Sequence, residues 1–160
     1  MTDILPPRPM SASRISLAQL MQPEFANPLG NVHGGHIMKM ADEAGAMACM
    51  RHAHRRVVTV AIDQMEFHQP ILIGNLVTLT AEVTYAGRTS MEAAVQVVAE
   101  DPISGKQVHT NTAYLVYVAL DSTGTHPVPV PPLLAETPEE QARLEAGSQR
   151  QADRLARRKR

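Results

Sequence analysis

The spacing of apolar residues changes along the chain, from a helical period before residue 53 to an alternating period after residue 57. In the first stretch, apolar side chains recur three and four residues apart and therefore share one face of a helix. The opposite side is also mostly apolar, and a helix that is apolar almost all round is a buried one. We therefore expect a central helix wrapped by a sheet or by a partner subunit. The two sides carry Ile37, Met40, Ala41, Ala44, Met47 and Ala48 on one face, and Met38, Gly45, Ala46 and Cys49 on the other.

The alternating part of the chain predicts strands. We expect them over residues 57–67, 76–85, 91–99 and 108–120, with one short strand over 14–21 before the helix. In the strand over 76–85, the residues expected to face inward are Val77, Leu79, Ala81, Val83 and Tyr85, and those expected outward are Thr78, Thr80, Glu82 and Thr84. One strand, one helix and four strands joined by short turns predict an α+β fold. In such a fold an antiparallel sheet curls around a single helix.

Composition divides the chain into four parts. A Pro-rich segment over 1–13, expected to be flexible, precedes the domain over 14–121, and a stiff Pro-rich connector follows over 122–136. Thr137, Pro138 and Glu140 then supply an N-cap, a proline in the first turn and a glutamate at the third position, which predict a charged helix over 137–160. Basic residues outnumber acidic ones in that helix. No aromatic residues are interleaved, so we expect a solvated or oligomer-packing helix and no nucleic-acid partner.

Composition and charge exclude several classes of protein. The chain has 160 residues, a net charge of −1 and 44% hydrophobic residues, which fits one globular domain with a tail. Its single cysteine excludes an internal disulfide, and no paired-ligand spacing suggests a metal. The first residues lack the pattern of a signal peptide, and no segment reaches the ~20 apolar residues of a membrane span. We therefore expect a cytoplasmic protein without a membrane partner.

The start of the predicted helix carries the candidate chemistry. Gly34 and Gly35 open it, and a glycine pair there lets another molecule approach backbone N–H groups that the helix cannot satisfy. Those donors suit a carbonyl oxygen that becomes negative during a reaction. Of the two carboxylates further along, Glu43 lies beside Lys39 on a polar face. Asp42 lies among apolar residues, where partial shielding from water suits a general base. The alternative is that Asp42 caps a loop or pairs with an arginine.

An ordered series of motifs resembles the hotdog-fold acyl-CoA thioesterases, in particular the cytosolic long-chain or brain-type branch and its bacterial broad-specificity relatives. The motifs cover residues 14–132, with a charged C-terminal helix that is also usual in this branch. They include AN at 26–27, GNVHGG at 30–35, DEAG at 42–45, VVT at 57–59, SME at 90–92 and VPP at 130–132.

The resemblance implies hydrolysis of fatty acyl-CoA to a free fatty acid and coenzyme A, with no metal and no cofactor beyond the coenzyme A of the substrate. It implies that Asn27 holds the thioester carbonyl or the water, and that the Gly34 N–H polarises the carbonyl. Asp42 would activate water or attack directly, and Thr59 would help to place the water. His33 and Gly35 are candidate substrate contacts, although a histidine that holds the loop together is an equal alternative. The loop residues expected to bind coenzyme A are Arg88, Thr89 and Ser90.

The same resemblance implies a homodimer with each site built across the dimer interface, and a trimer of such dimers, which is common in this family. Helix geometry also favours a site shared between two subunits. Asp42 lies two turns beyond the opening at Gly34, about 12 Å along the axis at 1.5 Å per residue. A base and an oxyanion donor must lie closer than that around one thioester carbon. We therefore expect Asp42 of one subunit to face Gly34 of the other.

Two other functions compete with hydrolysis. Asn27-Pro28-Leu29 superficially resembles the motif of hotdog hydratases and dehydratases, but Phe25 and Gly30 stand where that motif has its catalytic aspartate and histidine. A non-catalytic module that binds or senses acyl-CoA is the second alternative. No DNA-binding domain is attached to this sequence, and both Asn27 and Asp42 are retained, which favours an enzyme. An assay for released thiol would distinguish all three.

Overall fold

The computed structural model describes residues 5–63 and 65–159. Residues 1–4 of the expected N-terminal segment, Gln64 in the expected strand over 57–67, and the final residue of the expected C-terminal helix lie outside the described residues. In chain order the elements are β1 (Arg8–Pro9), the 3₁₀ helix η1 (Met10–Ser13), β2 (Ile15–Leu20), η2 (Pro23–Phe25), α1 (Gly34–Ala53), β3 (Arg56–Ile62), β4 (Leu76–Ala86), β5 (Ser90–Glu100), β6 (Gln107–Leu120), β7 (Leu133–Leu134) and α2 (Pro138–Arg158).

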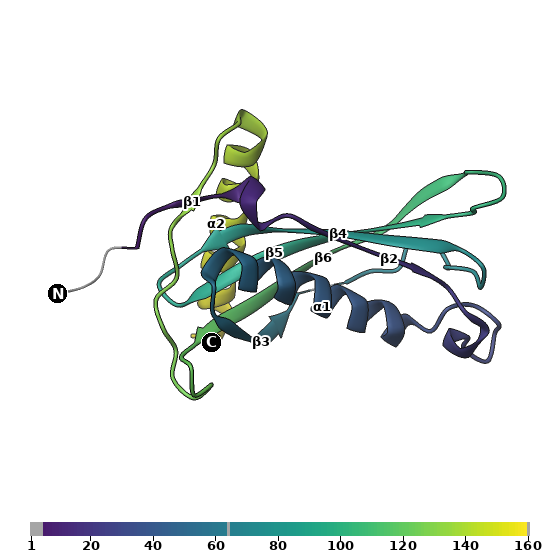
Figure 1. The fold of residues 1–160 in the computed structure, drawn as a ribbon, viewed down its shortest axis with the longest axis horizontal. Coiled ribbons are helices and arrows are strands. Elements are labelled where there is room, and N and C mark those ends of the chain that lie inside the picture. The colour runs from purple at the N-terminus through teal and green to yellow at the C-terminus, as the bar shows by residue number, and fades with distance from the viewer. Residues whose placement is uncertain (1–4, 64, 160) are drawn as a thin grey trace.

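The main sheet has five strands in the order β2-β4-β5-β6-β3, and every neighbouring pair is antiparallel. It curls over α1, which lies along one of its faces (Figure 1). This arrangement confirms the predicted α+β fold, an antiparallel sheet around one central helix with a further helix at the C-terminus. Strands β2 and β3 form the two edges, so each has one side without a strand partner among the described residues.

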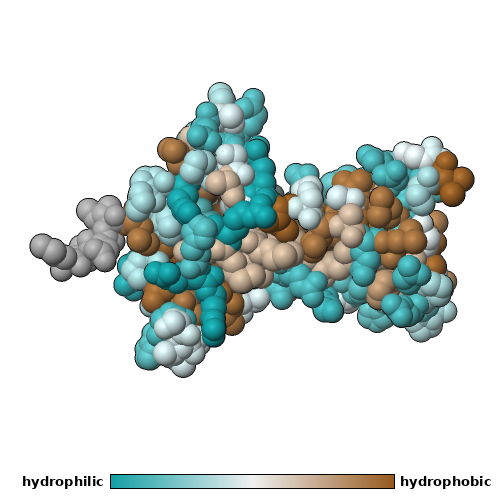
Figure 2. Space-filling view, viewed as in Figure 1, coloured by the Kyte–Doolittle hydropathy of each residue, from teal (hydrophilic) through white to brown (hydrophobic). Residues whose placement is uncertain are grey.

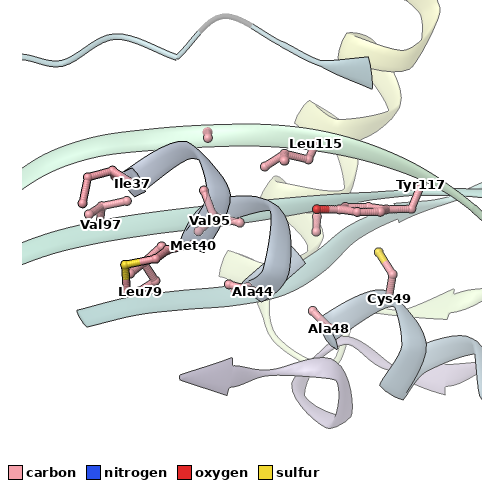
Figure 3. Close-up of a cluster of buried hydrophobic side chains, with 14 of the residues drawn as sticks. Ile37, Met40, Ala44, Ala48, Cys49, Leu79, Val95, Val97, Leu115 and Tyr117 are labelled. Carbon is pink, nitrogen blue, oxygen red and sulfur yellow. The ribbon is translucent and has the colours of Figure 1, made fainter. Parts of the chain in front are cut away.

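The core lies between α1 and the concave face of the sheet, where apolar residues of alternate positions on β4, β5 and β6 meet the helix (Figure 3). Ile37, Ala44 and Ala48 on α1 are almost completely buried, as are Leu79, Val95 and Leu115 on the strands. Small helix residues bring the backbone of α1 close to the sheet. The predicted inward set on β4 is correct for Val77, Leu79, Ala81 and Val83.

Both ends of α1 are held by side chains. The ring of His33 accepts a hydrogen bond from the Gly35 N–H at 3.0 Å and so satisfies one of the free N–H groups of the first turn. At the other end, His54 adopts the left-handed conformation with φ 50° and stops the helix. The Arg8 guanidinium donates to the carbonyl of His52 at 2.7 Å, which places a cation at the negative end of the helix dipole.

Helix α2 packs on the opposite face of the sheet from α1. Thr137 caps it, accepting a hydrogen bond from the Glu140 N–H at 3.1 Å, as the sequence predicted. A Cβ on Gly147 would lie only 2.7 Å from the carbonyl oxygen of Thr84, so the helix backbone nearly touches β4. Arg150 and Arg154 both bind the carboxylate of Glu92, which is fully buried on β5. The helix is therefore not only solvated, because one of its faces packs on the sheet of its own chain; packing of α2 between subunits remains a prediction.

This contact also explains an error on β4. Thr84, expected to face solvent, is 1% exposed because α2 covers it, and Tyr85, expected inward, is only half-buried. The pairing of β4 with β5 shifts register between Val83 and Tyr85, which marks a β-bulge there. A bulge changes which face the following residues occupy, and simple alternation along the sequence does not anticipate it.

Three other boundaries differ from the sequence expectations. Within the segment 1–13, expected to be flexible, β1 pairs in parallel with β7 and Met10 is fully buried. The connector over 122–136 is likewise attached to the domain, because Val130 and Pro131 are buried. Strand β3 ends at Ile62 rather than at residue 67. Contacts with residues far away in the chain hold the described part of the segment 1–13 and the connector over 122–136 in place, and local composition does not predict such contacts.

We predict that stability decreases as the pH falls below about 6.5, partly because of His52. Burial, assisted by the charges of Arg8 and His54, lowers the pKa of His52 below its usual 6.5. The folded state therefore resists a proton that the unfolded chain accepts, and the stabilisation present above pH 6.5 is lost as the pH falls towards the lowered pKa. The free energy of unfolding should fall by at most about 1.4 kcal/mol per pH unit from this group.

Urea denaturation at a series of pH values between 7.5 and 5 would test this prediction. His52→Gln should flatten the slope, whereas His109→Gln, at an exposed position on β6, should leave it unchanged. Equal slopes for wild type and His52→Gln would show that His52 does not contribute.

Candidate active site

The loop before α1 fixes the side chain of Asn27. Its backbone N–H donates to the carbonyl of Asn31 at 2.7 Å, and its Oδ1 accepts hydrogen bonds from the N–H groups of Leu29 and Asn31. The side-chain oxygen is therefore occupied within the loop. The amide NH₂ is the group left to donate outward, which suits the predicted contact with a carbonyl oxygen or a water.

The opening of α1 separates the roles of three predicted residues. His33 caps the helix, so of the two alternatives for this residue the structure supports holding the loop together. Its Nδ1 occupies the N–H of Gly35, which is consequently not available to a ligand in this arrangement. Gly34 is the first residue of the helix, and its N–H is among the donors that no helical carbonyl can accept. The contacts of His33 and Gly35 with substrate remain predictions.

Asn27 and Gly34 line one cavity of about 330 Å³, together with Ile37, Phe67 and Pro70. The Phe67 ring lies 3.4 Å from where a Cβ of Gly34 would be, so a side chain there would enter the space that the ring bounds. Leu29, Phe67 and Leu72 are exposed nearby, and apolar surface gathers at this end of the molecule (Figure 2). The cavity thus combines a free backbone donor, an amide donor and apolar walls.

The predicted base lies elsewhere on the helix. Asp42 is half-buried, and its Oδ1 accepts a hydrogen bond from the Thr59 hydroxyl on β3 at 2.7 Å. The phenol of Tyr117 on β6 donates to the Asp42 carbonyl oxygen at 2.8 Å and lies 3.2 Å from the same Oδ1. In the described part of the chain the partners of Asp42 are hydroxyl groups rather than an arginine. Glu43 is exposed and forms the expected pair with Lys39, at 3.6 Å.

The family resemblance implied roles for Asp42 and Thr59 around one water, but no role for Tyr117. Its ring is completely buried, and burial followed by the nearby charge of Asp42 raises the pKa of the phenol, which keeps it a proton donor. One signal was present in the sequence. Gly45 lies in the interior of α1, where glycine costs about 1 kcal/mol relative to alanine. A Cβ at that position would lie 2.4 Å from the Tyr117 oxygen, so the glycine provides the space for the phenol.

Arg88 and Thr89 lie in the turn between β4 and β5, and Ser90 is the first residue of β5. The carbonyl of Thr89 accepts a hydrogen bond from Ala119, and that of Arg88 from Val130, so the backbone of this turn is tied to β6 and to the segment after it. The Arg88 side chain is exposed. Tyr117 pairs with Met91, the residue after Ser90, which places this turn near the Asp42 cluster. Binding of coenzyme A by these three residues remains a prediction.

The cavity at Asn27 and Gly34 and the carboxylate at Asp42 are separate within one chain. Asp42 and Thr59 are not among the described residues that line the cavity. The loop that carries Asn27 joins the segment before β4 through the Asn31–Leu72 bridge, whereas Thr59 and Tyr117 pair near the start of β5. The donors and the base therefore lie at different positions along the sheet.

Other reactive groups offer little chemistry. Cys49 is completely buried, and burial raises the pKa of its thiol well above the usual range, so it packs in the core. Among residues 5–63 and 65–159, no group of three or more His, Cys, Asp or Glu side chains is arranged to hold a metal ion. Within the same residues, no helix combines the length and the apolar character that a membrane span needs.

A five-stranded antiparallel sheet around one helix, with a carboxylate at mid-helix and free N–H groups at the helix start, defines a hotdog-fold protein. A family model described as the thioesterase superfamily matches residues 29–106. The cytosolic acyl coenzyme A thioester hydrolase of Rattus norvegicus is 37% identical over 160 residues. The alignment covers 97% of this chain but 42% of the rat protein, so the chain spans less than half the length of that relative.

Solved structures match along nearly the whole chain. An acyl-CoA hydrolase from Staphylococcus aureus, in complex with butyryl coenzyme A, coenzyme A and coenzyme A disulfide, has a TM-score of 0.88 and 35% identity, covering 96% of this chain and 93% of that one. A hexameric acyl-CoA thioesterase in the apo form has a TM-score of 0.90 and 34% identity, covering 96% and 97%. The chain belongs to the acyl-CoA thioester hydrolases of the thioesterase superfamily.

We predict that Gly45→Ala destabilises the protein, although alanine favours a helix. The added methyl group would overlap the Tyr117 oxygen, and overpacking of this kind costs about 1–3 kcal/mol. Chemical denaturation would measure the loss. Adding Tyr117→Phe should recover part of it, because the phenol oxygen is the nearest atom to the new methyl group. A Gly45→Ala protein as stable as the wild type would contradict the close packing of α1 on β6.

Proposed function

We propose that this chain hydrolyses fatty acyl-CoA thioesters to a free fatty acid and coenzyme A. The observation that carries the proposal is the Asp42 carboxylate, half-buried on α1 and held through one oxygen by the Thr59 hydroxyl at 2.7 Å. The S. aureus relative has also been studied with alanine in place of an asparagine, an aspartate and a threonine. Those three residues have the same spacing along their chain as Asn27, Asp42 and Thr59, which supports the same assignment here.

In the proposed reaction a water molecule gives a proton to Asp42 while its oxygen forms a bond to the thioester carbon. The carbonyl oxygen becomes negative and is stabilised by the N–H of Gly34 at the positive end of α1, with the Asn27 amide beside it. One such donor contributes about 3 kcal/mol to the stability of the transition state. The carbon–sulfur bond then breaks, and the proton held by Asp42 neutralises the leaving thiolate. This series of reaction steps requires no metal and no protein nucleophile.

The active unit in this proposal is a homodimer. Asp42 and the Gly34 cavity are apart within one chain, so a second copy has to bring them together. The open edge of β3 is suited to that contact, because Val58, Val60 and Ile62 are 44%, 44% and 43% exposed. Apolar branched side chains on an unpaired edge strand favour pairing with another strand. Two β3 strands related by a two-fold axis would place the two α1 helices side by side, antiparallel.

The proposed larger assembly of this chain and its proposed location in the cell are based on its relatives. The hexameric neighbour supports a trimer of such dimers, and the cytosolic name of the rat relative supports a cytoplasmic location. The proposed binding of the coenzyme A moiety by Arg88, Thr89 and Ser90 is supported by their position near the Asp42 cluster, since Met91 pairs with Tyr117.

Replacing the proposed base is the first test. Asp42→Asn retains the shape of the side chain but cannot take a proton, so turnover of acyl-CoA should fall by about two to four orders of magnitude. Release of free thiol measures turnover, and circular dichroism checks the fold. Glu43→Gln is the matched control, the same kind of change on the adjacent exposed residue, and should cost little activity. A nearly fully active Asp42→Asn enzyme would assign the base elsewhere.

The dimeric site can be tested by mixing subunits. Asn27→Ala and Asp42→Ala proteins should each be nearly inactive alone, because each removes one half of every site. When they are unfolded and refolded together, random pairing makes half of the dimers mixed, each with one intact site. About a quarter of wild-type activity should therefore return. No recovery, with mixed dimers verified by mass spectrometry of differently tagged subunits, would mean that one chain builds the whole site.

A further inference from the structure

The carboxylate of Asp42 is held from two strands at once. Thr59 on β3 and Tyr117 on β6 are directly opposite each other in the antiparallel ladder, so both side chains face α1. Figure 3 shows Tyr117 extending from its strand with the phenol oxygen directed at the helix. Both hydroxyl groups meet the same atom, Asp42 Oδ1, at 2.7 Å from Thr59 and 3.2 Å from Tyr117.

The phenol makes a second contact that Thr59 does not. Its oxygen is 2.8 Å from the backbone carbonyl oxygen of Asp42, so a single group lies against both the main chain and the side chain of one residue. This fixes the carboxylate relative to the helix axis and limits its rotation. Gly45, three residues further along α1, leaves the space that the phenol needs to make both contacts.

We propose that Tyr117 is a positioning residue for hydrolysis: together with Thr59 it occupies Oδ1 of Asp42, so that Oδ2 is the oxygen that accepts the proton of the attacking water. This inference rests on the proposed function. Thr59 donates to Oδ1, and the single proton of the phenol is shared between the Asp42 carbonyl at 2.8 Å and the same Oδ1 at 3.2 Å, which leaves Oδ2 available in one orientation. Such preorganisation matters because a base has to lie within about 3 Å of the proton that it removes.

The surroundings keep the phenol in this role. Tyr117 is completely buried, with Gly45 against its ring on the helix side. Burial and the negative charge of Asp42 both disfavour the phenolate, so the group remains a donor across the pH range in which the enzyme would work. The position of the ring is also fixed by the strand pairing on both sides, with Thr59 on β3 and Met91 on β5.

Tyr117→Phe removes the donor and keeps the ring in the core. We expect the kcat for acyl-CoA to fall about tenfold, with KM within about twofold of wild type, because the phenol acts on the base and not on substrate binding.

Tyr114→Phe is the matched control, because it makes the same chemical change on the same strand, where the Tyr114 ring stacks under Arg150 on the α2 face instead. It should retain wild-type kcat and KM. In the double variant Thr59→Val with Tyr117→Phe, kcat should fall by a larger factor than the product of the two single-variant factors, because in each single variant the remaining hydroxyl still holds Oδ1. A simple product would overturn the claim that the two hydroxyls share one oxygen.

The outcomes are distinguishable from failure of the proposed function. Wild type that releases no thiol would overturn both the function and this inference. An active wild type and an inactive Asp42→Asn enzyme, with an unchanged Tyr117→Phe enzyme, would overturn only the inference. If Tyr117→Phe lowers unfolding stability and raises KM as much as it lowers kcat, its role is structural, and the inference is equally overturned.

Discussion

The structure depends on the burial of a helix that is apolar on almost every side. One curled sheet can cover only part of such a helix, and here it covers the face that carries Ile37, Ala44 and Ala48. On the remaining side, Met38 is 39% exposed and Ala46 is half-buried. Apolar helix surface that its own chain does not cover favours association. The same constraint therefore connects the core to the proposed dimer and to the position of the carboxylate between them.

The position of Asp42 follows from how closely α1 approaches the strands. Ala44, Gly45 and Ala48 have little or no side chain, so the helix backbone lies near β6 and a phenol can reach it from the sheet. A bulkier helix would be displaced outward, and the carboxylate would lose its hydroxyl partners. The small residues of α1 therefore determine both the close packing of the core and the geometry around Asp42.

Much of this architecture is predictable from the sequence because it is encoded locally. The helical spacing of α1, the alternation of Val77 and Leu79 on β4 and the Thr137 cap of α2 depend on residues close together in the chain. The contacts that were missed connect distant positions: Tyr117 meets Asp42 across 75 residues, and Arg150 meets Glu92 across 58. Local composition does not predict contacts between residues so far apart in the chain. For the same reason the Pro-rich segments were expected to be looser than they are.

The two edges of the sheet have different chemistry, and this limits how far the sheet can extend. Strand β3 presents Val58, Val60 and Ile62 outward, whereas the exposed positions of β2 are Ser16, Ala18 and Leu20, with Arg14 just before them. When an edge strand pairs with its own copy across a two-fold axis, its free backbone groups are no longer available to another strand. The outer edges of the resulting double sheet would be the short, more polar β2 strands, which are poor templates for a further strand. In the proposed dimer, growth of the sheet would therefore end at two subunits, and a continuous fibre would be avoided.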